Sequence, residues 1–313
     1  MNATLSQEVS TAGAVALSDA ALELAGAAIS PRTQALYRRE LDRVRADCEP
    51  LTDATLAEHL TRRHRAGAAP STLSLTVAAV RFAAKLRGRP RPDGPAVALV
   101  LDGIRRNGRN RGRGQVKGLT WSQADLAAAV AANGGASLAG LRDAALIALQ
   151  SDALLRVSEL CALSVEDVQG QTDGSGRVTV RHSKTDQAGE GAVLYVRRVT
   201  MRRIEAWKQD AGITTGPLFR RVYRGGQRTG ANALSTAATR SILKRRTGAA
   251  GLEAARISGH SARVGAAQSL VRHGATVPEL QQVGRWKSSA MPAHYARAEL
   301  AGRSAVARLR EDA

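Results

Sequence analysis

The sequence of 313 residues has only two cysteines, Cys48 and Cys161, too few for a disulfide framework or a cysteine-based zinc site. It has no hydrophobic run approaching the ~20 apolar residues that a membrane span needs. The N-terminus carries Glu8 and Glu23 and no basic leader before an apolar block, so it does not resemble a secretion signal. These absences predict a cytoplasmic protein with no membrane partner.

Acidic residues are also scarce. The 27 Asp and Glu residues face 46 Lys and Arg residues, which gives a formal net charge of +19. Only six of the basic residues are Lys, and the other 40 are Arg, whose planar fork of N–H donors matches phosphate oxygens. A GC-rich genome explains a preference for Arg over Lys but does not explain the excess of positive charge. The charge therefore predicts a DNA-associated protein with a nucleic-acid partner.

Several catalytic signatures are missing as well. The sequence contains no Gly-x-x-x-x-Gly-Lys-Ser/Thr phosphate loop, no His-Glu-x-x-His, and no group of carboxylates suited to Mg²⁺. A metal-dependent nuclease is therefore disfavoured, and we expect no metal and no cofactor.

The N-terminal part of the chain predicts a flexible arm over 1–29, followed by an all-helical domain over 30–107. Ser30, Asp53, Ser71 and Asp93 are expected helix caps, and a glycine follows three of the four helices. The expected helices cover residues 31–47, 53–65, 71–87 and 94–106. The basic residues expected to bind DNA on this domain are Arg38, Arg39, Arg62, Arg81, Lys85, Arg105 and Arg106.

Residues 108–118 are rich in glycine and arginine and contain no acidic residue. This composition predicts a flexible linker that lies along nucleic acid, contacting it through Arg109, Arg111, Arg113 and Lys117. The alternative interpretation is a solvated tether between two domains.

From residue 119 onward the pattern predicts a second, mixed α+β domain that extends to 313. Alternation with a period of two predicts strands at 177–183 and 192–197, joined by a polar loop, and hence a small antiparallel sheet. Helices are expected on both sides of these strands, beginning at Ser122 and covering 139–152, 156–162, 200–210, 234–246, 260–273, 277–283 and about 298–311. The fold class predicted for the chain is mainly α.

Charged groups at helical spacing stand out in this second domain. Arg156 and Glu159 are three residues apart, and so are His260 and Arg263, so each pair lies on one helix face. Each pair alone is typical of an ordinary surface contact. Trp286 and, nine residues later, Tyr295 extend the pattern.

Taken together, these segments resemble the tyrosine recombinases, also called the phage integrases. The resemblance is carried by Leu154–Leu160, Ser183–Thr185, Ser258–Ala267, Val277–Leu280, Gly284–Trp286 and Tyr295. The N-terminal half matches in size and layout only. The resemblance implies a helical core-binding domain and a catalytic domain that form a C-shaped clamp on DNA.

The resemblance also implies an activity: site-specific recombination through a 3′-phosphotyrosyl intermediate and a Holliday junction, without metal or ATP. Tyr295 is the expected nucleophile, since its phenol, with a pKa of about 10, becomes reactive beside positive charge or a base. Arg156 and Arg263 are expected to hold the phosphate, and Glu159 to orient Arg156. His260 is expected to donate hydrogen bonds or accept the phenolic proton.

Two further residues complete the expected catalytic set. Lys184 is the expected general acid, because an amine releases its proton where a guanidinium does not. Most members of the family have His where this chain has Trp286. An indole N–H donates a hydrogen bond but does not titrate, so Trp286 is expected to stabilise the phosphate and to pack.

The expected partners are double-stranded DNA with inverted-repeat half-sites and further copies of the chain. A homotetramer on two duplexes, with a dimer at each site, is expected to assemble through an exchange helix at about 298–311. Two alternatives are a DNA-binding protein with a retired active site and a relaxing topoisomerase. A serine recombinase is disfavoured, because Ser6 and Ser10 lie in the expected arm.

Overall fold

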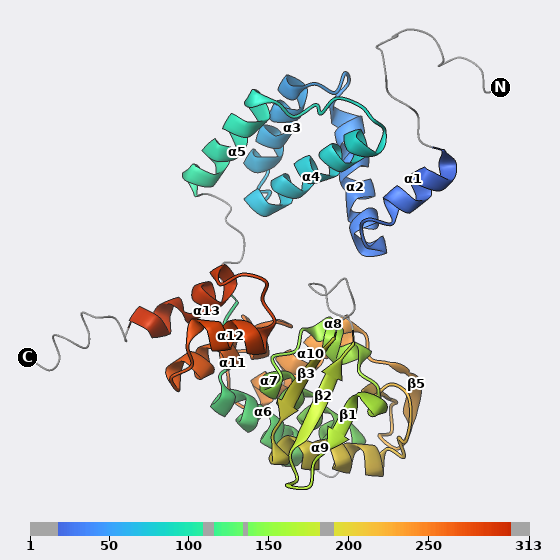
Figure 1. The fold of residues 1–313 in the computed structure, drawn as a ribbon, viewed down its shortest axis with the longest axis vertical. Helices are drawn as coiled ribbons and strands as arrows, with labels where there is room; N and C mark the ends of the chain where they lie inside the picture. The colour runs from blue at the N-terminus through green and yellow to red at the C-terminus, as the bar shows by residue number, and fades with distance from the viewer. Residues whose placement is uncertain (1–17, 109–115, 134–136, 182–190, 302–313) are drawn as a thin grey trace, which may run out of the picture. The chain divides into compact units, whose positions relative to one another are not determined.

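The computed structural model describes residues 18–108, 116–133, 137–181 and 191–301 (Figure 1). It divides into two compact units, residues 1–114 and 115–313. The described residues are mainly helical with small antiparallel sheets, as predicted. None of the helices in these ranges is long and apolar enough to cross a membrane.

The first unit consists of helices alone within its described part. They are α1 Asp19–Gly26, α2 Pro31–Asp47, α3 Asp53–Arg65, α4 Pro70–Leu86 and α5 Pro95–Asn107. Helix α1 begins after Ser18, whose Oγ accepts the N–H of Ala21 at 3.3 Å. The expectation of a flexible arm through residue 29 is therefore wrong for 19–26, where a capped helix forms.

The start of α5 depends on a residue from another helix. Asp53 was expected to cap its own helix α3, but Thr52 caps that helix, with its Oγ1 accepting the N–H of Thr55. The Asp53 carboxylate instead accepts three backbone N–H groups at the start of α5, from Gly94 at 2.7 Å, Ala96 at 2.8 Å and Val97 at 3.0 Å. Asp53 therefore caps α5 across the helix bundle.

Two other expected caps are also wrong. Helix α4 begins after Ala69, without a side-chain cap, rather than at Ser71. Asp93 caps no helix, because its carboxylate binds Arg81 at 2.7 Å and Arg91 at 2.9 Å. The core of the unit lies between α2, α3, α4 and α5 and is formed by Val44, Leu56, Leu60, Leu73, Val77, Val80, Val97, Leu101 and Ile104.

The second unit combines helices with two small sheets. Its helices are α6 Trp121–Asn133, α7 Leu138–Asp152, α8 Val157–Ala162, α9 Arg198–Asp210, α10 Thr236–Ala249, α11 Ser261–Arg272, α12 Val277–Gly284 and α13 Ala290–Ala301, with a 3₁₀ turn at Val165–Asp167. Helix α7 is buried over most of its length and runs through the main core. Figure 1 shows α11, α12 and α13 gathered on the side of the unit opposite strand β5.

The larger sheet has three antiparallel strands in the order β1-β2-β3, with bounds Val168–Gly170, Gly176–Val180 and Ala192–Val196. Strands β2 and β3 are the predicted pair, in a register that places Val178 opposite Leu194. Strand β1 was not predicted, and neither was the hairpin of β4 Arg220–Val222 and β5 Thr229–Ala233. The loop between β2 and β3, including Lys184, lies outside the described residues from 182 to 190.

The expected helix near 298–311 is described only over its first residues, 298–301, which belong to α13. Helix α13 begins at Ala290, carries Tyr295 in its middle and is described to Ala301. The remainder of the expected exchange helix, from residue 302 onward, lies outside the described residues.

Candidate active site

The site is built on the short turn that joins α7 to α8. Leu154 adopts the left-handed conformation there, with φ of 48°, which is rare for a residue other than glycine. Its side chain is buried in a small apolar cluster with Ala266, Ala267 and Leu280. Its carbonyl oxygen accepts hydrogen bonds from Arg263 and Arg285. The strained turn therefore presents a backbone acceptor to two guanidinium groups.

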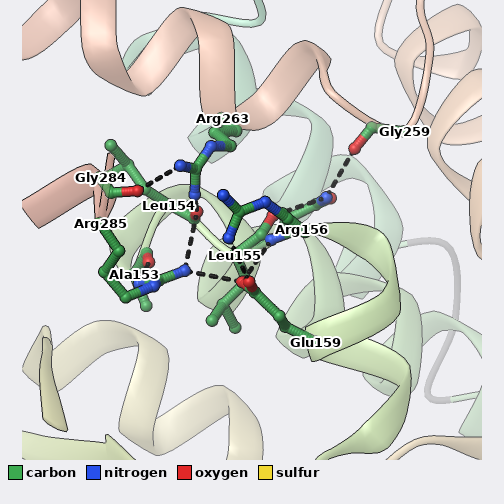
Figure 2. A network of polar contacts seen from close by, with 10 residues as sticks. Ala153, Leu154, Leu155, Arg156, Glu159, Gly259, Arg263, Gly284 and Arg285 are labelled. Atoms are coloured by element: carbon green, nitrogen blue, oxygen red, sulfur yellow. Dashed lines mark hydrogen bonds and ion pairs between the residues drawn. The ribbon is translucent and has the colours of Figure 1, made fainter. Parts of the chain in front are cut away.

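Arg156 and Glu159 lie at the start of α8, as the spacing of three residues predicted (Figure 2). Arg156 is the N-cap residue, and its Nη1 donates to Glu159 Oε1 at 2.6 Å. The other carboxylate oxygen, Oε2, accepts the backbone N–H of Arg156 at 2.9 Å. Glu159 thus holds both the backbone and the side chain of Arg156, which agrees with its expected orienting role.

Arg263 lies on α11 with only 3% of its surface exposed. Its Nη1 donates to the Leu154 carbonyl and its Nη2 to the Gly284 carbonyl. The guanidinium also lies over the Trp286 ring, 4.4 Å from the ring centroid, as a cation–π contact. Two neutral carbonyls and an aromatic face therefore position this guanidinium without cancelling its charge.

Tyr295 follows Trp286 in this stack. The two ring centroids are 5.7 Å apart, and Tyr295 is half-buried against the cluster that contains Leu154. Tyr295 is also close enough to Arg263 for a phenolate there to favour the charged guanidinium. The structure thus brings Arg263, Trp286 and Tyr295 into one contiguous group, as the sequence predicted.

His260 is the residue just before α11 and is solvent-exposed. A glycine precedes it where the chain passes close to α8: a Cβ on Gly259 would lie 2.5 Å from Val157 Cγ2. The Gly259 carbonyl accepts from Gln150 Nε2 at 2.9 Å, which ties this turn to α7. Close packing of the two turns therefore places His260 near the arginines.

Arg285 belongs to the site and was not among the predicted site residues. It follows α12 directly, and its Nη2 donates to Glu159 Oε2 at 2.7 Å. Figure 2 shows the side chains of Arg156, Arg263 and Arg285 converging on the Leu154 carbonyl and Glu159. The sequence carried one signal for it, namely its position directly before Trp286 in a segment already singled out.

Electrostatics within the site keep Glu159 ionised. Burial alone raises the pKa of Glu159, but Arg285, and then the backbone and side chain of Arg156, outweigh burial and hold the pKa below its ordinary value. The carboxylate therefore stays charged at neutral pH and continues to hold both guanidiniums.

Burial and neighbouring positive charges lower the pKa values of Arg263 and His260. Burial, followed by the charges of Arg156 and Arg285, lowers the pKa of Arg263 to about 9, which leaves the guanidinium charged at neutral pH. The pKa of His260 is also lowered. The first cause is partial burial, which removes some of the water that would hydrate the charged ring, and the second is the positive charge of Arg263, Arg156 and Arg240. His260 is therefore neutral at pH 7 and able to accept a proton.

No group of three or more His, Cys, Asp or Glu side chains suited to a metal ion occurs within the described ranges. The expected general acid Lys184 lies in the undescribed loop between β2 and β3. Strand β3 is followed by Arg197, which donates from Nε to Asp152 Oδ1 at 2.7 Å. Asp152 ends α7, four residues before Arg156, so the sheet that carries the loop is anchored beside the site.

The residues expected to bind DNA fall into three groups. Arg38, Arg39, Arg62, Lys85 and Arg106 are exposed on the first unit, without an ion pair in the part of the chain that is described. Three others are engaged with acids: Arg81 with Asp93 at 2.7 Å, Arg105 with Asp102 at 2.7 Å, and Lys117 with Glu253 at 2.5 Å. The last group lies outside the described residues: Arg109, Arg111 and Arg113.

Sequence comparison relates this chain to known proteins. The sequence model of the phage integrase family matches residues 119–301. Recombinase Cre of Escherichia phage P1 is 26% identical over 277 residues, covering 84% of this chain and 81% of that protein. An integrase/recombinase XerD homolog of Selenomonas ruminantium is 34% identical over 164 residues, covering 50% of this chain and 48% of that protein.

Solved structures with the same fold include three complexes with DNA. The Tn1549 transposon integrase in complex with a circular intermediate DNA has a TM-score of 0.62 at 14% identity, covering 90% of this chain and 99% of that chain. XerH bound to a palindromic difH substrate in a post-cleavage complex has a TM-score of 0.61 at 14% identity, covering 82% and 72%. A lambda integrase tetramer bound to a Holliday junction has a TM-score of 0.58 at 16% identity, covering 90% and 77%.

Proposed function

The chain belongs to the phage integrase family of tyrosine-type site-specific recombinases, and we propose that it exchanges DNA strands through a covalent 3′-phosphotyrosyl intermediate, without metal or ATP. The observation that carries this proposal is the contiguous group formed by Arg263, Trp286 and Tyr295 beside Arg156. It combines a phenol with two guanidiniums, and these are the groups that a metal-free phosphoryl transfer requires.

In the cleavage step, the Tyr295 oxygen attacks the phosphorus, the bond between phenol and phosphate forms, and the bond to the 5′-oxygen breaks. Neutral His260 accepts the phenolic proton, in agreement with its lowered pKa. Arg156 and Arg263 stabilise the charge that develops on the non-bridging oxygens, and the Trp286 N–H donates a further hydrogen bond. Lys184 supplies the proton that the leaving 5′-oxygen takes.

The second step reverses the first on a new strand. A 5′-hydroxyl of the partner duplex gives its proton to Lys184 and attacks the phosphotyrosyl phosphorus. The bond between phosphorus and phenol breaks, and Tyr295 recovers its proton from His260. Because the phosphodiester energy is retained in the covalent bond, no nucleotide cofactor is consumed. Two such exchanges, one on each strand pair, pass through a Holliday junction.

We propose an assembly of four copies on two duplexes, with a dimer at each inverted repeat. In this assembly residues 30–107 form the core-binding domain, 108–118 the basic linker and 119–313 the catalytic domain, and the two domains clamp the DNA. One feature of the second unit supports subunit docking: an apolar groove of about 760 Å³ beside the site, lined in part by Trp121, Leu194, Tyr195, Leu270 and Val283. The apolar residues Val306 and Leu309 of a neighbouring copy are the proposed occupants.

The test is covalent capture on DNA. Wild type and Tyr295→Phe are incubated with a library of duplexes that carry random half-sites around a nicked spacer, then denatured, and protein-linked DNA is recovered and sequenced. We expect a 3′-linked adduct with wild type alone, enriched in inverted repeats. Adducts without repeat enrichment indicate a relaxing topoisomerase, and the absence of adducts from both proteins indicates a retired active site.

A further inference from the structure

The backbone at Arg285 is unusual for a residue of its kind. Arg285 has φ of 55° and ψ of 47°, in the left-handed region that glycine enters freely and other residues rarely adopt. A non-glycine residue persists in such a conformation when the surrounding structure holds it there. Here the backbone N–H of Arg285 donates to the Gln282 carbonyl at 3.1 Å and closes the end of α12, and the side chain adds contacts that a glycine at this position would lose.

Those contacts reach the turn before α8 and Glu159 in the first turn of α8. Arg285 Nη1 donates to the Ala153 carbonyl at 3.2 Å, and Nη2 donates to Glu159 Oε2 at 2.7 Å and to the Leu154 carbonyl at 3.4 Å. The side chain is 11% exposed. One buried guanidinium thus connects the segment that carries Trp286 and Tyr295 to the turn that carries Arg156.

The Glu159 carboxylate is divided between two arginines. Oε1 faces Arg156 Nη1 at 2.6 Å, while Oε2 faces Arg285. The three guanidiniums of Arg156, Arg263 and Arg285 and the one carboxylate give the cluster a net charge of +2. Without Arg285 the net charge is +1, and Glu159 and Arg156 form a neutral pair. Arg285 therefore allows Glu159 to orient Arg156 without cancelling the positive charge of the site.

We propose that Arg285 is a positioning residue for strand cleavage, which acts through Glu159 to hold Arg156 and the Tyr295 segment in the reactive arrangement. The inference rests on the proposed function, because its kinetic consequence appears in the formation of the phosphotyrosyl adduct. Its structural consequence, the coupling of Arg285 to Glu159, is measurable without DNA.

The principal variant is Arg285→Gly, because glycine suits the backbone and removes the guanidinium. With DNA recovered in the capture experiment, we expect the maximal rate of adduct formation to fall about 30-fold, equivalent to about 2 kcal/mol at 1.4 kcal/mol per tenfold, with half-saturation by DNA within threefold of wild type. Arg285→Lys keeps the positive charge but loses the planar set of N–H donors. Its maximal rate of adduct formation is expected to lie between the rates of wild type and Arg285→Gly. Arg272→Gln is the matched control: it removes the 2.6 Å ion pair between α11 and Glu299 of α13, remote from Glu159.

A double-variant cycle tells whether Arg285 affects cleavage through Glu159 or only through the general stability of the second unit. In a Glu159→Gln background, Arg285→Gly is expected to slow cleavage by no more than about threefold, because the route through the carboxylate is already removed. An undiminished loss in that background, or an Arg285→Gly rate within threefold of wild type, would overturn the proposal. A loss with Arg272→Gln equal to that with Arg285→Gly would overturn it as well.

The DNA-independent measurement is the melting temperature as a function of pH. Glu159 has a lowered pKa in the folded state, so its stabilisation is present above about pH 4.5 and is lost as the pH falls through the folded pKa. Loss of Arg285 raises that pKa, so the difference in melting temperature between wild type and Arg285→Gly is expected to narrow below pH 4.5. In the Glu159→Gln background, the change in melting temperature caused by Arg285→Gly is expected to be constant with pH. If wild type forms no adduct, the proposed function fails, whereas a pH-independent difference in the native background contradicts the Arg285 proposal.

Discussion

A single backbone carbonyl, that of Leu154, helps to orient two arginines of the site. The Leu154 oxygen accepts from both Arg263 and Arg285, and the Gly284 oxygen accepts from Arg263 as well. A neutral acceptor orients a guanidinium through its dipole and leaves the full positive charge, whereas each additional carboxylate would cancel one charge. The left-handed turn at Leu154 therefore preserves the positive potential that a phosphate requires.

The role of Lys184 is tested by changing the leaving group of the substrate. Lys184→Ala is expected to slow cleavage of ordinary DNA by about 100-fold or more, because removal of a general acid typically costs 10²–10⁴ in rate. A 5′-sulfur leaving group needs little protonation, so on that substrate the same variant is expected to lose less than about tenfold. Single-turnover adduct formation measures both rates.

The matched control is Lys208→Ala. Lys208 lies on α9 and pairs with Glu205 at 3.0 Å on the same helix, so both substrates should react as they do with wild type. An equal defect of Lys184→Ala on the two substrates would show that Lys184 acts in some way other than by protonating the 5′-oxygen.

Motif spacing predicted most of the site and missed one member for a physical reason. Arg156, Glu159, Arg263, Trp286 and Tyr295 were recognised because their spacing matches a family pattern, and the structure brings them together. The role of Arg285 depends on a left-handed backbone and on which way a long side chain turns. Neither can be inferred from the sequence Gly-Arg-Trp, so only the three-dimensional structure shows that Arg285 belongs to the site.

At the scale of elements, long periodic helices were predicted more accurately than short strands. The expected helix at 31–47 matches α2, and 53–65 matches α3, because an apolar face repeats over several turns. Strands β1 and β4 have three residues each, too few for an alternating pattern to be distinguished from a loop. The cap of α5 was mispredicted because its capping side chain, Asp53, belongs to another helix.

Substitution of Asp53 tests whether a side chain from α3 caps helix α5. Asp53→Ala removes the acceptor of three N–H groups at the start of α5, so we expect the melting temperature of the first unit to fall by several degrees. The measurement is differential scanning calorimetry of the full chain. Ser71→Ala is the control, since Ser71 is exposed within the first turn of α4 and caps nothing, and its melting temperature should match that of wild type. Equal effects of the two substitutions would contradict the assignment of Asp53 as the cap of α5.

For the whole molecule, the distribution of charge matters more than its sum. The 46 Lys and Arg residues include arginines already paired with acids, such as Arg81 beside Asp93 and Arg63 beside the buried Glu40. The net charge of +19 subtracts these acids but does not say where the unpaired positive charge lies. The segment 108–118 contains no acid of its own, so its arginines are the strongest candidates for phosphate contacts in the sequence.

Salt dependence of DNA binding measures those contacts. A triple variant with Gln in place of Arg109, Arg111 and Arg113 is expected to reduce the slope of log affinity against log salt by about 3, since each phosphate contact contributes ~0.9. The control changes net charge equally by placing Gln at three arginines that already pair with acids: Arg45, Arg91 and Arg198. Because those charges are neutralised locally, the control slope should stay close to that of wild type. Equal reductions in both variants would show that DNA responds to overall charge, and that residues 108–118 act as a solvated tether.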